Sequence, residues 1–214
     1  MVGRMAVRMV ICGLWRASRL PATQDAFAIS ECLCFVDARL FDTYNLNKYR
    51  PMTLSIPSTT ATMTPEDIAA QEAALTFPRF THLDALKVGE ALTREGLSRG
   101  LPIAIDVYLF ERTVYSAGLP GSTADNLDWI RRKRNVVLRF GKSSFRIGRE
   151  RAAKGVSLHD NAAISEVDYA AHGGSFPILV EGTGPIGAIS VSGLPGHEDH
   201  ATIIAALTKL RAEA

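Results

Sequence analysis

The pattern of hydrophobic and polar positions in residues 63–214 first predicts two helices. Thr64 is followed by a proline and two acids, which is the pattern of a helix start with a hydroxyl cap and proline in the first turn. Residues 82–99 then place apolar side chains roughly on one helical face, and Gly100 follows where such a helix would end. We therefore expect helices from Thr64 to about Leu75 and over residues 82–99.

Two later segments change to strand character. Residues 102–118, "PIAIDVYLFERTVYSAG", are rich in β-branched and aromatic side chains and predict a hairpin with its turn near Glu111. Residues 176–193, "FPILVEGTGPIGAISVSG", predict a second hairpin around the glycines of residues 182–185. Gly187 within this hairpin indicates a bulge or a close approach of another backbone.

The remaining pattern predicts helices and one irregular connection. A long cationic helix is expected from about residue 125 to 153, with Gly141 and Gly148 dividing or bending it. An irregular connection with short helical turns follows over residues 155–175. Residues 198–214 form an amphipathic pattern that begins with two acids, typical of a helix N-terminus.

The predicted order of elements is α, α, β, β, α, β, β, α, with no internal repeat. Hairpins between helices, rather than single strands, indicate a mostly antiparallel sheet flanked by helices, an α+β arrangement within the α/β class. A chain of 214 residues has the length of one domain with an appended tail.

Composition and charge limit the classes of partner. A hydrophobic content of 47% and a charged content of 21% are ordinary for a soluble globular protein. Residues 63–214 carry seventeen Lys and Arg against eighteen Asp and Glu, so the expected domain is not basic. This balance argues against nucleic acid as a partner. No apolar run reaches the ~18 residues of a membrane-spanning helix, so we expect no membrane partner and a cytoplasmic protein.

The first 62 residues differ from the rest of the chain. They are Arg-rich with no acid before Asp25, and they hold all three cysteines, so the expected domain contains no disulfide, thiolate metal site or catalytic cysteine. A secretory signal, an organellar transit peptide and a non-native extension before Met52 or Met63 all stay open. We expect residues 1–62 to be a poorly ordered leader or extension and residues 63–214 to be the folded domain.

The strongest charge feature is the segment of residues 130–151, in which nine residues are Lys or Arg and one is acidic. On a continuous helix, four of these cations would form one stripe: Arg139, Lys142, Arg146 and Arg149. One interpretation is a solvated or subunit-facing surface whose cations form ion pairs. The other is an anion site in which Arg131, Arg132 or Arg134 binds carboxylates or phosphates.

Candidate chemistry lies outside this segment as well. Asp106 stands in an apolar strand and needs a partner, either a nearby arginine or a ligand. His172 precedes Gly173 and Gly174, where backbone N–H groups could approach a ligand while the imidazole serves as an acid–base group or a structural residue. The other candidate residues are Ser192, before a helix start that could hold an anion, and His200, which with His172 is a candidate metal ligand.

Several of these segments together resemble a known family. "HGGSFPI" at residues 172–178, "GPIGAISVSGLPGHEDH" at residues 184–200, "IAIDVY" on the first hairpin and "DNLDWIRRKRNVVLRFGKSS" are similar to the GlcG-like, haem-degrading-domain (HbpS-like) superfamily, over residues 64–211. The resemblance implies a profilin-like three-layer α/β/α fold, a homo-oligomer, and haem or iron binding. It supplies no set of catalytic residues.

These observations lead to the expectation of an oligomeric protein that binds a small anionic ligand, with haem as a candidate cofactor. The two propionates of haem would pair with arginines while an imidazole meets the iron. Two alternatives stay open: an assembly or adaptor protein without catalysis, and an enzyme that degrades haem.

Overall fold

The structure, a computed structural model, describes residues 62–213, which lie in the unit Leu46–Ala214 of the chain. The expectation for the N-terminal leader therefore falls outside the described residues. Among the residues described, no helix is both long and apolar enough to cross a membrane.

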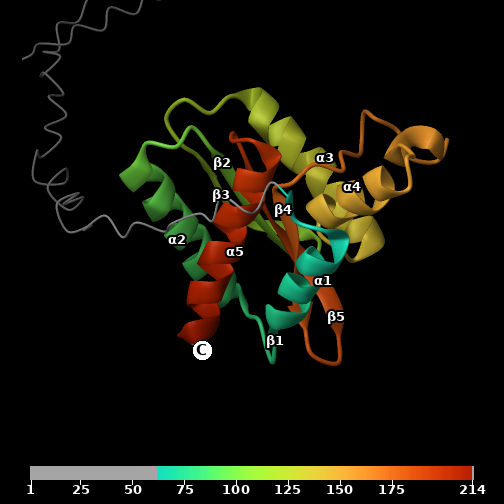
Figure 1. Cartoon of the computed structure of the whole chain (residues 1–214). Helices are drawn as coiled ribbons and strands as arrows, with labels where there is room; N and C mark the ends of the chain where they lie inside the picture. The colour runs from blue at the N-terminus through green and yellow to red at the C-terminus, as the bar shows by residue number, and fades with distance from the viewer. Residues whose placement is uncertain (1–61, 214) are drawn as a thin grey trace, which may run out of the picture. The chain divides into compact units, whose positions relative to one another are not determined.

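A five-stranded sheet forms the centre of the described region (Figure 1). Its strand order is β1-β4-β5-β2-β3, and every neighbouring pair is antiparallel except β1 with β4, which is parallel. The strands are β1 (Thr76–Phe77), β2 (Ala104–Leu109), β3 (Arg112–Gly118), β4 (Ser175–Val180) and β5 (Gly184–Ser192). The mostly antiparallel sheet predicted from the sequence is confirmed.

Both predicted hairpins are present. The β2–β3 turn consists of Phe110 and Glu111, which have φ of 49° and 61°, so this two-residue turn needs a conformation that few non-glycine residues adopt. In β5, Gly187 lies against β2 so closely that a Cβ atom would meet the carbonyl oxygen of Tyr108. The expected close approach at Gly187 is confirmed.

One face of the sheet is covered by α2 (His82–Arg99) and α5 (Gly196–Ala212), which lie in front of it in Figure 1. Alternate residues of the strands point to this face and pack against the helices as the main hydrophobic core. The largest fully buried members of this core are Leu92, Ile103, Ile105, Leu109, Phe176, Ile178, Ile189, Ile203 and Leu207.

The opposite face of the sheet is covered by α3 (Ala124–Phe140), so the predicted three layers are present. The strand residues that alternate with the apolar core positions are small or polar on this face, among them Asp106, Ser175 and Ser190. Because these side chains are short, α3 lies close to the sheet and buries Ile130 and Val137 there.

The predicted long cationic helix is divided. Gly141 has φ of 65° and ends α3, and the hydroxyl of Ser143 then caps a separate helix, α4 (Ser144–Ala153). The expectation of one stripe of cations is therefore wrong, because Lys142 lies in the link between two helices rather than on a shared face. α1 (Pro65–Ala74) packs against α4.

Two helix starts follow the local rules closely. The hydroxyls of Thr64 and Thr81 each accept a hydrogen bond from the N–H three residues later, and the carboxylates of Asp67 and Asp84 each accept one from the backbone N–H of the cap residue. The connection from α4 to β4 contains one short 3₁₀ turn, Leu158–Asp160, as the sequence predicted.

Candidate functional site

Two of the four consecutive cations of α3 form ion pairs close to the protein surface. Arg131 pairs with Asp128 at 3.0 Å and with Asp168 at 2.9 Å. Arg134 donates to Asp106 at 2.7 Å, and its guanidinium lies 4.3 Å from the ring centroid of Tyr108. The carboxylate of Asp106 thus has an arginine partner, one of the two interpretations open from the sequence.

Lys133 points the opposite way, into the interior, and only 2% of the residue is exposed. Its Nζ donates to the carbonyl oxygens of Gly173 (3.1 Å) and Val191 (2.8 Å) and to Oδ2 of Asp199 (3.1 Å). The other carboxylate oxygen of Asp199 accepts the N–H of Leu194. This single amino group therefore joins α3, the loop before β4, the end of β5 and the start of α5.

The buried pair of Lys133 and Asp199 was not predicted from the sequence. Lys133 stands three residues after Ile130 and four before Val137, so its position on the buried stripe of α3 was a usable signal. Burial lowers the pKa of Lys133 and raises the pKa of Asp199 to about 6, while the attraction between the two charges opposes both shifts. The pair fixes the loop that carries His172.

Arg132 differs from its three neighbours because it has no carboxylate partner within residues 62–213. Its Nε donates to the carbonyl oxygen of Glu166 at 2.9 Å, and its guanidinium lies 4.6 Å from the ring centroid of Trp129. The indole is oriented in turn by a hydrogen bond from Nε1 to Asp125. Within residues 62–213, the contacts of Arg132 are therefore with a carbonyl oxygen and an indole ring, and no carboxylate neutralises its charge.

His172 is exposed next to this arginine. Its ring meets Trp129 edge-on, with the centroids 5.3 Å apart. Desolvation of the ring, together with the nearby positive charges of Lys133 and Arg132, lowers the pKa of His172. The imidazole is accordingly neutral at pH 7, the form that binds metal ions and accepts protons. We call Trp129, Arg132 and His172 the Trp129–His172 surface.

The two glycines after His172 are needed for packing. A Cβ atom on Gly173 would meet the carbonyl oxygen of Gly196, and one on Gly174 (φ 114°) would meet the amino group of Lys133. Both residues are buried, so their close contacts are with the protein itself. Ser192 is also buried, opposite Ala104 at the end of β5.

His200 lies in a different environment from His172. It is fully buried, its Nε2 lies 2.9 Å from Oε1 of Gln71, and its ring centroid is 5.0 Å from that of Phe145 and 5.8 Å from that of Phe176. Burial lowers the pKa of His200 to about 4. Within residues 62–213, no group of three or more His, Cys, Asp or Glu side chains could hold a metal ion.

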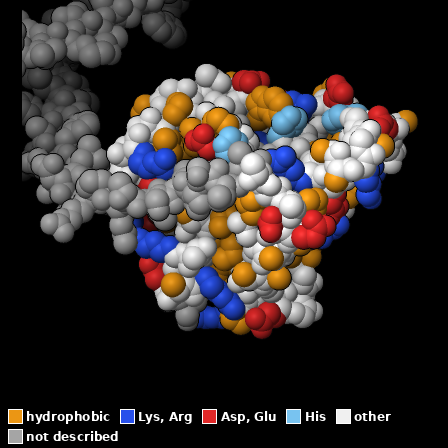
Figure 2. Space-filling model, viewed as in Figure 1, with side chains coloured by type: hydrophobic (Ala, Val, Ile, Leu, Met, Phe, Trp, Pro, Cys, Tyr) orange, Lys and Arg blue, Asp and Glu red, His pale blue; other side chains and the backbone are white. Residues whose placement is uncertain are grey.

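Charge at the surface is mixed. On the face drawn in Figure 2, Lys and Arg side chains stand among Asp and Glu side chains rather than in one continuous area. This face therefore shows the mixture of positive and negative side chains that the composition predicts.

Comparison with known proteins places the chain among relatives over most of this region. The family described as haem degrading protein HbpS-like matches residues 80–208. A UPF0303 protein from Rhizobium leguminosarum bv. trifolii is 49% identical over 146 residues, 68% of this chain and 88% of the relative. A UPF0303 protein from Streptomyces avermitilis is 45% identical over 141 residues, 66% of this chain and 86% of the relative.

Solved structures agree in fold. The Ybr137w protein superposes with a TM-score of 0.66 at 27% identity, covering 74% of this chain and 94% of that one. A PduOC:heme complex superposes with a TM-score of 0.53 at 12% identity, covering 60% and 93% of the two chains, which supports a shared fold only. With the family match spanning more than half of its length, this chain belongs to the HbpS-like haem-degrading protein family.

Proposed function

We propose that this protein binds a small anionic ligand, with haem as the first candidate, at the Trp129–His172 surface. The observation that carries the proposal is the charge of Arg132, which no carboxylate of the described residues neutralises while Arg131, Lys133 and Arg134 are all paired. An arginine that is oriented but not neutralised is suited to bind a carboxylate or phosphate of a ligand.

The chemistry of the three side chains fits haem. Arg132 would pair with a propionate, the indole of Trp129 offers a flat apolar surface, and His172 offers a neutral imidazole nitrogen as an axial ligand. When bound, haem would supply an iron centre for binding or oxidising small molecules. Haem is favoured over other anions because the family is described as haem degrading and the PduOC neighbour is a complex with haem.

A hemin titration of the full chain, followed by the Soret absorbance, tests the proposal. We expect a saturable change at one hemin per chain that is lost in His172→Ala and weakened at least about 10-fold in Arg132→Gln, because a hydrogen bond to a charged group contributes about 1.5–3 kcal/mol. His82→Ala, which removes another exposed histidine, is the matched control. A weak, non-saturating change that is equal in all four proteins would refute a specific haem site.

Self-association is the second part of the proposed function. Leu83 is 68% exposed at the start of α2 and Phe110 is 54% exposed in the β2–β3 turn, and the ring of His82 lies 5.8 Å from that of Phe110. Large apolar side chains exposed on two elements that pack together favour a contact with a second copy. Light scattering of the wild type and of a Leu83→Ser/Phe110→Ser variant would measure this, and a monomeric wild type would refute it.

A further inference from the structure

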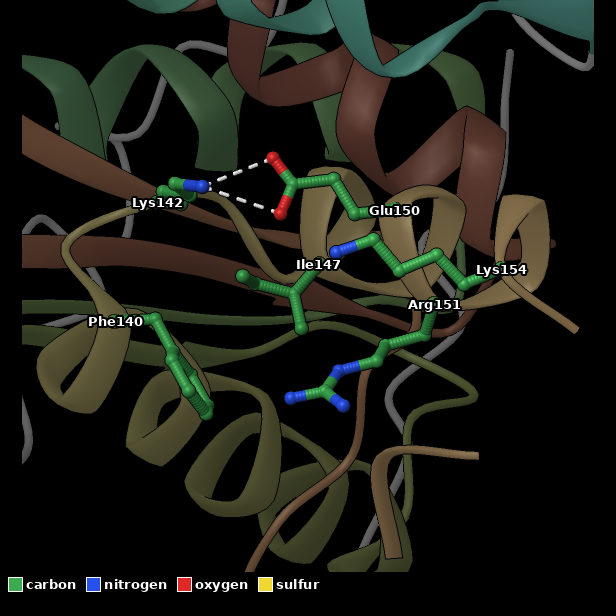
Figure 3. Close-up of a pocket in the computed structure, with 6 residues that line it drawn as sticks. All are labelled: Phe140, Lys142, Ile147, Glu150, Arg151 and Lys154. Atoms are coloured by element: carbon green, nitrogen blue, oxygen red, sulfur yellow. Dashed lines mark hydrogen bonds and ion pairs between the residues drawn. The ribbon is translucent and has the colours of Figure 1, made fainter. Parts of the chain in front are cut away.

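A pocket of about 330 Å³ lies between the end of α3 and α4, away from the Trp129–His172 surface (Figure 3). Phe140 and Ile147 form its apolar part, and its charged lining residues are Lys142, Glu150, Arg151 and Lys154. Along α3, Phe140 comes 11 residues after Trp129, roughly 16 Å at 1.5 Å per residue. The two places can therefore bind different groups.

The carboxylate of Glu150 in this pocket already accepts hydrogen bonds from Lys142 and Arg146. Both carboxylate oxygens of Glu150 accept hydrogen bonds from Nζ of Lys142, at 3.0 and 3.1 Å, and Oε1 also accepts Nε of Arg146 at 2.9 Å. Burial alone would raise the pKa of Glu150, but the hydrogen bonds and positive charges of Lys142 and Arg146 lower it. Glu150 therefore stays ionised and positions Lys142.

Arg151 and Lys154 are the remaining charges of the lining. Neither side chain has an ion-pair partner in the described part of the chain. In Figure 3 both extend from α4 toward Ile147, with the guanidinium of Arg151 on the side of Phe140. With three cations and one acid, the lining has a net charge of +2.

The apolar part of the pocket is built on a packed base. Ile147 belongs to a small buried cluster with Val136, Leu158 and Ile164, and Phe140 packs against the edge of that cluster. A ligand of matching shape would place an apolar group against Phe140 and Ile147 and its charge toward Arg151 and Lys154. The volume is at the lower end of the range for ligand pockets, which suits a small molecule.

We propose that this pocket is a second binding site, for a small dianion with an apolar body such as an aryl phosphate monoester. The two unpaired cations match the two charges of the phosphate group, and the phenyl ring of Phe140 and the side chain of Ile147 match the aryl group. The proposal is independent of haem binding at the Trp129–His172 surface.

Isothermal titration of the full chain with phenyl phosphate and, separately, with inorganic phosphate tests the site. We expect one saturable site for phenyl phosphate with weaker binding of inorganic phosphate, because only the former contacts the apolar wall. Arg151→Gln/Lys154→Gln should lower the affinity for phenyl phosphate at least about 10-fold, since each charge-assisted hydrogen bond contributes about 1.5–3 kcal/mol. Arg79→Gln/Lys87→Gln removes the same charge from exposed positions and should leave binding unchanged.

Two other outcomes would overturn the proposed site. Arg151 and Lys154 lie at the end of α4, where cations also stabilise a helix. A variant that unfolds more easily but binds phenyl phosphate as the wild type does would assign them to that structural role and overturn the site. An equal loss in both double variants would overturn it too, because only net charge would then matter. Hemin binding should be unchanged in Arg151→Gln/Lys154→Gln, so failure of one proposal does not affect the other.

Discussion

Replacement of Lys133 by methionine tests the buried ion pair that joins α3 to α5. Methionine keeps most of the length and apolar volume of the lysine stem but removes Nζ. The carboxylate of Asp199, whose side chain is 3% exposed, would lose its cation. The carbonyl oxygens of Gly173 and Val191 would each lose a donor at the same time.

The expected cost follows from these losses. Breaking a buried ion pair by removing one partner costs about 3–5 kcal/mol, because a charge is left buried without compensation. We therefore expect Lys133→Met to lower the free energy of unfolding by about 3–5 kcal/mol at pH 7. Asp199→Asn keeps an oxygen for the N–H of Leu194 and should cost less.

Urea unfolding of the full chain, followed by far-UV circular dichroism, measures these values. In a double-mutant cycle with Asp199→Asn, the combined loss should fall short of the sum by about 1–3 kcal/mol. Lys87→Met, at an exposed position of α2, is the control and should cost less than about 0.5 kcal/mol. A loss below about 1 kcal/mol for Lys133→Met, or strict additivity in the cycle, would refute the reasoning.

The pH dependence of the variant gives a further check. Lys133 holds the pKa of Asp199 down, so its removal should raise that pKa above its present value of about 6. A carboxyl group whose pKa is raised in the folded state binds more protons folded than unfolded, so the stability of the variant should fall as pH rises. The deficit relative to wild type should therefore be smaller at pH 5 than at pH 7.

Three further predictions concern other buried groups. Burial lowers the pKa of His200 to about 4, so the unfolded state takes up a proton first as pH falls below about 6.5. The free energy of unfolding should therefore drop by on the order of 3 kcal/mol between pH 7 and 4. Urea midpoints should depend less on pH in His200→Gln than in the wild type, and an unchanged dependence would contradict this. Glu72→Gln keeps the acceptor for the N–H of Ser143 but loses the 2.7 Å ion pair to Arg146, so calorimetry should report a loss of about 1–3 kcal/mol, and no loss would mean the pair is not formed. Gly173→Ala would place a Cβ against a backbone carbonyl and should cost about 1–3 kcal/mol; Gly118→Ala, which meets only a movable side chain, is its control, and equal effects would show that packing at Gly173 is loose.

Elements with local signals could be predicted from the sequence. The helix starts at Thr64 and Thr81 depend on side chains three residues away, and the turn at Phe110 and Glu111 depends on the two strands it joins. The division at Gly141 was among the expected outcomes because a left-handed residue ends a helix without help from elsewhere. These features gave the element order and the antiparallel sheet.

The polar pairs of the interior could not be predicted in the same way. The partner of Lys133 lies 66 residues away in Asp199, and the partner of Arg146 lies 74 residues away in Glu72. Neither separation follows from any local pattern, because the first depends on how α3 and α5 pack and the second on how α1 and α4 pack. The two-residue strand β1 was missed for the same reason, since it is defined only by its parallel pairing with β4.

The two faces of the sheet are stabilised by different kinds of interaction. The layer of α2 and α5 rests on aliphatic and aromatic side chains, whose contribution weakens on cooling and changes little with salt. The layer of α3 rests on small residues and on the cations of Lys133 and Arg134, which pair with Asp199 and Asp106. Cooling should therefore weaken the layer of α2 and α5 more than the layer of α3.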